Sequence, residues 1–457
     1  MAITRRQFVT RLGALAAAAG LSQSQIAKIT ESFAYGVWGS GKPKVVWVHG
    51  AECTGCSTSV LGLFEDARGT AIMTGDFAGT QTITALDLAV GGDGAAPYSV
   101  PRTLDTAGYN VDDQSDDGDM IVNIQDVLID VIELDYHETV MNMGGDLAAQ
   151  WLKDFMDNMS GLYVLVVEGA VQDKSQGGAW SDTAGNGFPW CSIGMSKDAA
   201  YTGATLTSGF DHSFDDVVAK LAAKAAATIA IGQCATFGGY PGCKSPLDST
   251  SAGFDTSQSQ TGAKGVYDFL YDKGGIYRQA SASVVNVPGC PTNPWWFILT
   301  VVAVLVDVDS VLGSGGTTLG VVTGTTTDDS GNTHLVLGAD SVDTTRRLKA
   351  AYPTAIHGPY CPRFNDWSGG RFAEKPGDPG CLQKIGCKGP AVKSLCGLHG
   401  WNAQQPENDT AWEFGLATAN PAGSSAYRGG HCTRAGHPCM GCTEKGYPDS
   451  FVPFVKW

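Results

Sequence analysis

Basic residues are scarce in this sequence. Its 457 residues include 30 lysines and arginines against 46 aspartates and glutamates, which gives a formal net charge of −16 at pH 7. A negative field of this size repels phosphate backbones, so the composition argues against a nucleic-acid-binding protein. We expect a partner with a basic surface instead.

Long hydrophobic runs are also missing. The longest run, residues 295–306, has twelve residues and includes Thr300, whereas a membrane-spanning helix needs about 20. We therefore expect a buried helix at this place. Residues 451–457 contain no apolar tail, so we expect no membrane anchor at the C-terminus.

The first residues have the features of an export signal. Arg5 and Arg6 precede Phe8, and a short apolar stretch follows over residues 12–21. This pattern is typical of the twin-arginine route, although an ordinary amphipathic helix is the alternative. We predict a signal segment over residues 1–35 and a location in the periplasm or at the outer face of the cytoplasmic membrane.

Short β-branched runs dominate the first two thirds of the chain. Each ends in a turn rich in glycine, proline or cysteine, and they cover residues 44–50, 132–136, 162–169, 228–234 and 283–290. Near-continuous apolar strands are typical of a parallel sheet buried on both faces. Because helical patterns lie between them, as at 145–158 and 214–226, we predict a doubly wound α/β domain. In such a domain the loops after the strands carry the functional site.

The pattern changes after this domain. A Thr/Gly-rich segment contains a predicted hairpin, and loop-rich, cysteine-bearing sequence follows it to the end. We predict the signal segment 1–35, an α/β domain over 40–310, the inserted segment 311–343 and a second domain over 344–457. Residues 91–119 form a polar insertion within the first domain.

Thirteen cysteines are the unusual feature of the composition. A chain of this size does not need disulfides in place of a core, and short fixed spacings are more typical of metal ligands. Without Cys191 and Cys243, eleven cysteines and one histidine remain, enough for three four-iron clusters. These candidate ligands are Cys53, Cys56, Cys234, Cys290, His357, Cys361, Cys381, Cys387, Cys396, Cys432, Cys439 and Cys442. Zinc sites and disulfide bonds are the alternatives.

Seven motifs around these ligands are more specific than any single cysteine. They are WVHGAECTGCS (47–57), LDYHET (134–139), GQCA (232–235), VPGCPTNP (287–294), IH with CPR (356–363), IGCKGP (385–390) and GHPCMGC (436–442). In this order, and across both domains, they resemble the small subunit of nickel–iron hydrogenases. The resemblance implies a flavodoxin-like domain followed by a domain that binds iron–sulfur clusters.

The resemblance also implies the role of each ligand. Four residues would hold a proximal 4Fe-4S cluster: Cys53, Cys56, Cys234 and Cys290. Four would hold a distal 4Fe-4S cluster: His357, Cys361, Cys381 and Cys387. The medial cluster between them would take Cys396, Cys439 and Cys442. A separate large subunit would carry the nickel–iron centre that splits hydrogen, and this chain would pass the electrons to a cytochrome or an adaptor subunit.

Two positions depart from the family pattern. Cys432 stands where many members have a proline, so the medial cluster should be 4Fe-4S instead of 3Fe-4S. The spacing from His357 to Cys361 is one residue longer than usual, and Pro359 lies inside it. Gly55 and Gly239 occupy positions where oxygen-tolerant members carry additional cysteines, so that mechanism is not supported.

Three polar residues complete the expected site. Glu52 matches a family position linked to proton passage, while His137 and Glu138 match a segment for which packing or a subunit contact is expected. The expected assembly is a heterodimer with the large subunit, or a dimer of such heterodimers. The alternatives are an electron-transfer subunit of a different oxidoreductase complex and a zinc-stabilised binding module.

Overall fold

The computed structural model describes 15 parts of the chain. They are residues 43–61, 76–77, 81–82, 132–159, 162–176, 179–181, 187–193, 212–244, 259, 261–309, 311, 320–358, 361–396, 401 and 432–456. The predicted signal segment 1–35 and the polar insertion 91–119 lie outside the described residues. All twelve candidate ligands lie within them.

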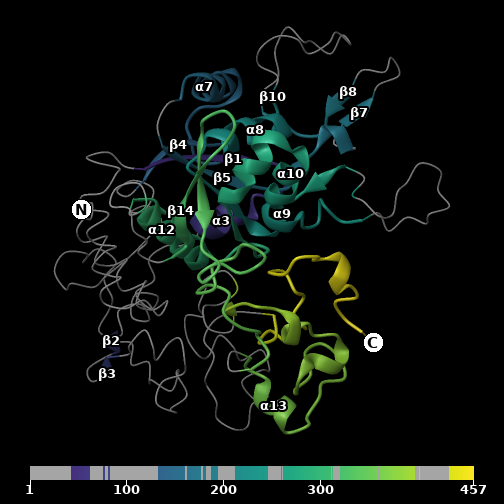
Figure 1. Ribbon diagram of the computed structural model, residues 1–457. Helices are drawn as coiled ribbons and strands as arrows, with labels where there is room; N and C mark the ends of the chain where they lie inside the picture. Colours follow the sequence, from purple (N-terminus) through teal and green to yellow (C-terminus); the bar gives the residue numbers. More distant parts are fainter. Residues whose placement is uncertain are drawn as a thin grey trace, which may run out of the picture.

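A five-stranded parallel sheet forms the centre of the molecule (Figure 1). Its strands, in spatial order, are β13 (Val284–Val287), β11 (Ala227–Ile231), β5 (Tyr163–Glu168), β1 (Lys44–His49) and β4 (Glu133–His137). Numbered along the chain, this order is 2-1-3-4-5, which is the flavodoxin-like arrangement. The predicted α/β class and the predicted parallel sheet are confirmed.

Helices cover both faces of the sheet (Figure 1). One face packs against α3 (Gly55–Leu61) and α12 (Pro294–Asp309). The other packs against α7 (Gly145–Asn158), α8 (Phe214–Lys224) and α10 (Val266–Lys273). Neighbouring residues of a strand point to opposite faces, so Trp47 enters the first core and Val46 and Val48 enter the second. Both sheet faces are therefore apolar, as continuous hydrophobic strands require.

Most predicted elements are confirmed within one or two residues, but two strands end three residues earlier than expected, and one of them is the predicted strand 283–290, which ends at Val287. The predicted strand 228–234 ends at Ile231, and α9 (Gly232–Phe237) begins immediately after it. Gly232 has a φ of +82°, a left-handed conformation that favours glycine and turns the chain from strand into helix. This turn places Cys234 in the first turn of α9 instead of at the strand end.

The apolar run 295–306 forms most of the buried helix α12, as predicted. No helix in the described part of the chain has both the length and the apolar character needed to cross a bilayer. The predicted hairpin is also present, as β14 (Val322–Thr327) and β15 (Thr333–Leu337). It is anchored to α12 because the fully buried carboxylate of Asp307 accepts the backbone N–H groups of Val321 and Val322, at 2.6 and 3.0 Å.

The C-terminal part contains little regular structure. It lies below the sheet in Figure 1, in light green and yellow. Its described elements include the short helix α13 (Phe364–Ser368) and the 3-10 helix Leu382–Ile385. Its small apolar clusters include cysteines: Cys361 and Cys439 pack with Ile356 and Val392. The predicted domain boundaries at 310 and 343 stay predictions.

Replacing Asp307 by alanine should destabilise the protein strongly, because two buried N–H groups lose their acceptor. We expect the free energy of unfolding to fall by about 2–4 kcal/mol, measured from the unfolding midpoint of the purified native protein. The control is Asp329→Ala, at the exposed tip of the hairpin, which should cost less than about 0.5 kcal/mol. Equal losses in the two variants would contradict this account.

Candidate metal centres

Four cysteines meet beyond the carboxyl ends of three sheet strands. Cys53 and Cys56 follow β1, Cys234 follows β11, and Cys290 follows β13. Burial raises the pKa of Cys234 to about 12, and the charges of Cys290 and Cys53 add to this effect. Burial also raises the pKa of Cys56, with further contributions from Glu168, Cys234 and Cys290. We call these four cysteines the proximal group.

Glycines allow close approach to the sulfurs of the proximal group. A Cβ atom on Gly232 would lie 2.3 Å from the sulfur of Cys56, and one on Gly239 would lie 2.8 Å from the sulfur of Cys234. Because any side chain at these positions would occupy the space beside a sulfur, the backbone forms a cradle around the group. The N–H of Thr292 also points to the sulfur of Cys56, at 3.4 Å.

A second set of cysteines, the medial group, gathers in the C-terminal part. It consists of Cys396, Cys432, Cys439 and Cys442. Burial raises the pKa of Cys396 to about 12; the hydrogen bond with Ser394 opposes this increase and the charge of Cys432 adds to it. Burial raises the pKa of Cys442 as well, and the charges of Cys396 and Cys432 add to it. Cys432 therefore lies among the other three thiols.

The third set, the distal group, contains His357, Cys361, Cys381 and Cys387. Burial raises the pKa of Cys361 to about 11, with smaller contributions from Cys387 and Cys381. A Cβ atom on Gly389 would lie 3.5 Å from the sulfur of Cys387 and 3.8 Å from the Cβ of His357, so histidine and cysteine are neighbours. Burial lowers the pKa of His357, which leaves the imidazole neutral and able to bind a metal.

The three groups are connected in one order. The side-chain amide of Gln233, beside Cys234, donates to the carbonyl oxygen of Glu444 at 2.9 Å, two residues after Cys442, which joins the proximal and medial groups. The backbone N–H of Cys439 donates to the sulfur of Cys387 at 3.3 Å, which joins the medial and distal groups. The medial group therefore lies between the other two.

The described thiols fit multinuclear clusters better than the two alternatives. All thirteen cysteines are free, so they form no disulfide bonds. A tetrahedral zinc ion with bonds of about 2.3 Å requires sulfurs about 3.8 Å apart. Among the described histidine, cysteine and acidic residues, no three cysteines have their sulfurs all within 4.8 Å of one another. Wider spacing and N–H donors to sulfur both suit an iron–sulfur cube.

Cys191 and Cys243 stay outside the three groups. Cys191 packs against the second core, and burial raises its pKa to about 12. The thiol of Cys243 lies 3.6 Å from the carbonyl oxygen of Gly239. Neither cysteine interacts with the charge of another described cysteine. This agrees with the exclusion of Cys191 and Cys243 from the candidate ligands.

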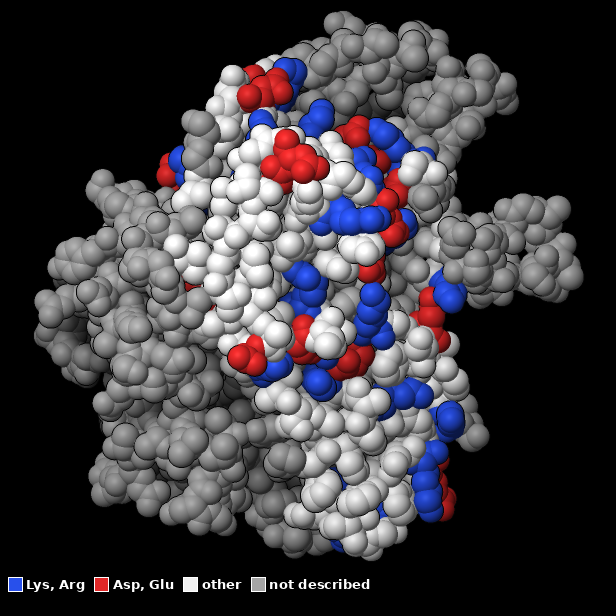
Figure 2. All heavy atoms as spheres, viewed as in Figure 1, with Lys and Arg blue, Asp and Glu red and all other residues white. Residues whose placement is uncertain are grey.

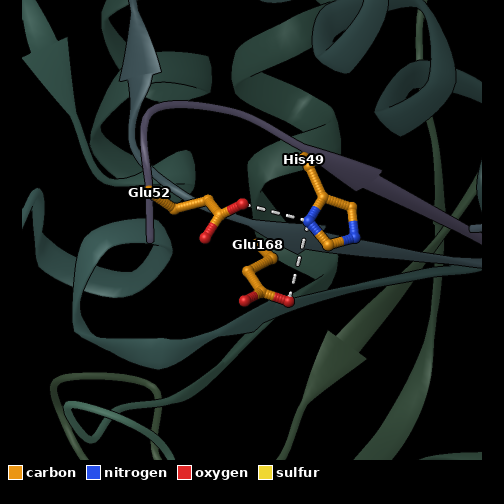
Figure 3. Close-up of side chains that lie close together, drawn as sticks. All are labelled: His49, Glu52 and Glu168. Atoms are coloured by element: carbon orange, nitrogen blue, oxygen red, sulfur yellow. Dashed lines mark hydrogen bonds and ion pairs between the residues drawn. The ribbon is translucent and has the colours of Figure 1, made fainter. Parts of the chain in front are cut away.

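Beside the proximal group, three polar side chains meet in the interior (Figure 3). Oε1 of Glu52 lies 3.2 Å from Nδ1 of His49, and Oε2 of Glu168 lies 3.9 Å from the same nitrogen. Burial opposes a proton on His49, but the hydrogen bond to Glu52 and the charges of Glu168 and Glu138 together raise its pKa. Glu52, the predicted proton-relay residue, thus contacts a partner able to exchange protons.

Sequence reasoning missed Glu168, at the end of β5. Its buried carboxylate accepts the N–H groups of Cys56 and Ser57, the hydroxyl of Ser57 and the indole N–H of Trp47, at 2.6 to 3.2 Å. It therefore fixes the backbone that carries a proximal cysteine. The available signal was a lone acidic residue at the end of an otherwise apolar strand, because a buried charge needs several partners.

His137 and Glu138 also lie beside this network. His137 accepts the N–H of Thr139 on Nδ1 at 3.2 Å, so its Nε2 carries the proton, 3.3 Å from the hydroxyl of Ser57. Burial lowers the pKa of His137 to about 3, and the charge of His49 contributes. Oε1 of Glu138 accepts the backbone N–H of His49 at 3.2 Å. His137 therefore packs within the chain, whereas Glu138 is exposed.

Two family models match the chain. Residues 118–304 match the model described as NADH ubiquinone oxidoreductase, 20 Kd subunit. Residues 352–410 match the C-terminal model of the NiFe/NiFeSe hydrogenase small subunit.

Curated relatives match over nearly the full length. The periplasmic [NiFeSe] hydrogenase small subunit of Desulfomicrobium baculatum is 26% identical over 456 residues, covering 99% of each chain. The periplasmic [NiFe] hydrogenase small subunit 1 of Nitratidesulfovibrio vulgaris is 25% identical and covers 99% of this chain and 93% of its own length. The solved [NiFeSe] hydrogenase of D. baculatum shares the fold, with a TM-score of 0.52 and 24% identity over 91% of this chain and 99% of that one.

The fold and the cysteine groups together define a class, the iron–sulfur proteins built on a flavodoxin-like sheet. Both family models and the full-length relatives narrow this class. Over nearly its whole length, the chain is similar to nickel–iron hydrogenase small subunits.

Substituting Gly232 by alanine should test the cradle around Cys56. The control is Gly275→Ala, because Gly275 also has a positive φ, +55° against +82°, but no heavy atom within 4 Å of the position its Cβ would take. Left-handed strain should cost both variants about 1 kcal/mol, and the clash with the Cys56 sulfur should cost Gly232→Ala about 1–3 kcal/mol more. Thermal unfolding of the native protein measures the difference; equal shifts in the two variants would refute the cradle.

Proposed function

We propose that this chain is the electron-transfer subunit of a nickel–iron hydrogenase and that its three cysteine groups hold three iron–sulfur clusters. The observation that carries the proposal is the order of the groups: Gln233, beside Cys234, hydrogen-bonds to Glu444 near Cys442, and Cys439 hydrogen-bonds to Cys387. A continuous series of redox centres needs this arrangement. The catalytic nickel–iron centre belongs to the large subunit, which pairs with this chain as a heterodimer or in a dimer of heterodimers.

Each group binds one cluster in this proposal. Cys53, Cys56, Cys234 and Cys290 bind the proximal 4Fe-4S cluster. His357, Cys361, Cys381 and Cys387 bind the distal 4Fe-4S cluster, and Cys396, Cys432, Cys439 and Cys442 bind a medial 4Fe-4S cluster. When bound, the clusters supply one-electron transfer between the large subunit and an external acceptor, a cytochrome or an adaptor subunit.

The residues of this chain orient the ligands and exclude water. Glu168 fixes the backbone of Cys56 and Ser57 by accepting both their N–H groups and the hydroxyl of Ser57, and the glycine cradle leaves room for the sulfurs. Oε1 of Glu52 lies 3.2 Å from Nδ1 of His49, close enough for a proton to pass between the two side chains. We propose that the folded chain is exported by the twin-arginine route to the periplasm or the outer face of the cytoplasmic membrane.

A second candidate is an electron-transfer subunit of another oxidoreductase complex, which the match of residues 118–304 to a 20 Kd oxidoreductase subunit favours. Anaerobic purification of the native complex separates the two. The hydrogenase proposal expects nickel in the partner, about twelve irons in this chain and dye reduction that depends on hydrogen. A complex with the iron but without nickel supports the second candidate, whereas colourless zinc-containing protein excludes both.

Removing the fourth medial thiolate should convert the medial cluster. In Cys432→Ala we expect the loss of about one iron per chain and a three-iron signal in electron paramagnetic resonance of the oxidised protein. The control is Cys191→Ala, outside the three groups, which should retain all the iron. A three-iron signal already present in freshly purified, anaerobic wild-type protein would show that Cys432 is not a ligand.

His357 should set the potential of the distal cluster. Imidazole is a neutral ligand, so His357→Cys adds a negative charge and should lower that cluster's potential by on the order of 100 mV. Redox titration followed by electron paramagnetic resonance measures the shift, and the proximal signals of the same sample are the internal control. An unchanged distal potential and unchanged turnover would exclude ligation by His357.

A further inference from the structure

The charge of the chain is divided unequally between its two parts. Residues 1–343 contain 17 basic and 38 acidic residues, whereas residues 344–457 contain 13 basic and 8 acidic residues. The first part therefore has a net charge of −21 and the second a net charge of +5. The part that contains the distal group is cationic within an anionic protein.

Two of these cations belong to the loop that carries the distal cysteines. Lys384 lies in the 3-10 helix between Cys381 and Cys387, and its side chain is exposed. Its ammonium group lies 4.3 Å from the centre of the Phe372 ring, which gives it a defined position. Lys388 follows Cys387 directly and hydrogen-bonds to the carbonyl oxygen of Pro453 at 3.2 Å.

Other cations reach the same place from neighbouring segments. The N–H of Cys381 donates to the carbonyl oxygen of Arg371 at 2.9 Å, so Arg371 lies beside a distal cysteine. The N–H of Lys456 donates to the carbonyl oxygen of Ile385 at 2.9 Å, which places Lys456 against the 3-10 helix. Arg371, Lys375 and Lys456 are exposed. In Figure 2, blue side chains line the lower right edge of the molecule.

Acidic residues do not cancel this charge. Between residues 361 and 388 there are three, against five basic residues. One of the three, Asp366, is buried and paired with Arg371. A second, Asp378, accepts the backbone N–H of Lys375 at 3.1 Å. The third, Glu374, is exposed beside Lys375, so the five basic residues exceed the acidic ones by two and the net charge around the distal group is positive.

An aromatic side chain connects His357 with this surface. The ring of Trp367 lies perpendicular to the imidazole of His357, with centroids 4.8 Å apart. Trp367 is 39% exposed, and its neighbours in the loop include Arg371, whose carbonyl lies beside Cys381. An exposed aromatic ring among cations is typical of a protein docking site.

We propose that this surface, which we call the distal face, docks a soluble one-electron carrier protein with an acidic binding surface. It consists of Arg371, Lys375, Lys384, Lys388 and Lys456 around Trp367. The inference rests on the proposed function and names the acceptor of the same electrons. In the step that follows docking, the distal cluster loses one electron and the carrier gains it, so no bond or proton changes place.

The net charge of the whole chain favours a basic partner, whereas the local charge of the distal face favours an acidic one. The distance over which charges act decides between these two partners. At physiological salt, charges more than about 8 Å apart are largely screened. The charges that act directly on a carrier in contact with the distal face are therefore those of its own lysines and arginine. Cations that served only to balance the charge of a buried cluster would not need exposed positions.

Charge reversal on the native complex tests the distal face. One variant is Lys375→Glu/Lys384→Glu, and its control is Lys153→Glu/Lys220→Glu, on α7 and α8, which changes the total charge equally. The probes are a small acidic ferredoxin and a basic c-type cytochrome. Two measurements are made at low and high salt: the dissociation constant of each probe, and the rate of its reduction by hydrogen relative to a small neutral dye.

We expect the ferredoxin to bind the wild-type complex about tenfold more tightly at low salt than at high salt. The distal double variant should lose about tenfold in ferredoxin affinity and in the relative rate at low salt, and the control should lose less than about twofold. Equal losses in the two variants would overturn the proposal, because net charge alone would then explain them. Tighter binding of the basic cytochrome, strengthened by the distal substitutions, would also overturn it.

The measurement of ferredoxin binding distinguishes failure of this inference from failure of the proposed function. If the native complex reduces no dye with hydrogen but binds ferredoxin with the expected salt and variant dependence, the hydrogenase proposal fails and the docking inference stands. If the complex reduces the dye with hydrogen and the distal substitutions leave the dissociation constant of ferredoxin unchanged, the docking inference fails and the proposed function stands.

Discussion

The structure depends on the burial of sulfur. Burial raises the pKa of cysteines in each of the three groups, among them Cys56, Cys361, Cys396 and Cys442, and neighbouring cysteines add to that effect. Such a group of anions is stable only when positive charge is bound among them. This requirement explains why the C-terminal part has so little regular structure: its apolar clusters are partly made of Cys361 and Cys439.

The sheet follows from the sequence more directly than the site does. Continuous apolar runs predicted all five strands and the buried helix α12, because a two-sided sheet imposes that pattern on local sequence. The end of β11 was predicted too late, since Gly232 belongs as plausibly to a strand end as to a turn. Glu168 was missed for another reason. Its partners Trp47, Cys56 and Ser57 are more than 100 residues away, and only the folded chain brings them together.

Motif spacing predicted which residues were candidate ligands, but it could not order the groups in space. The medial position of Cys396, Cys432, Cys439 and Cys442 follows from two hydrogen bonds, Gln233 with Glu444 and Cys439 with Cys387. Both join segments far apart in sequence. The unequal distribution of charge is different, because it was present in the sequence and becomes informative only when the cations are placed around the distal group.

The core on the α12 side of the sheet extends past the predicted domain boundary. Leu348, Tyr352, Leu395 and Cys396 pack in the same cluster as Val285 and Trp296. The two parts of the chain therefore cannot unfold independently at this junction. By linkage, any free energy gained when a metal binds at Cys396 is shared with the sheet. A chain that failed to load the medial site would be weakened throughout, and proteases could recognise and remove it as a whole.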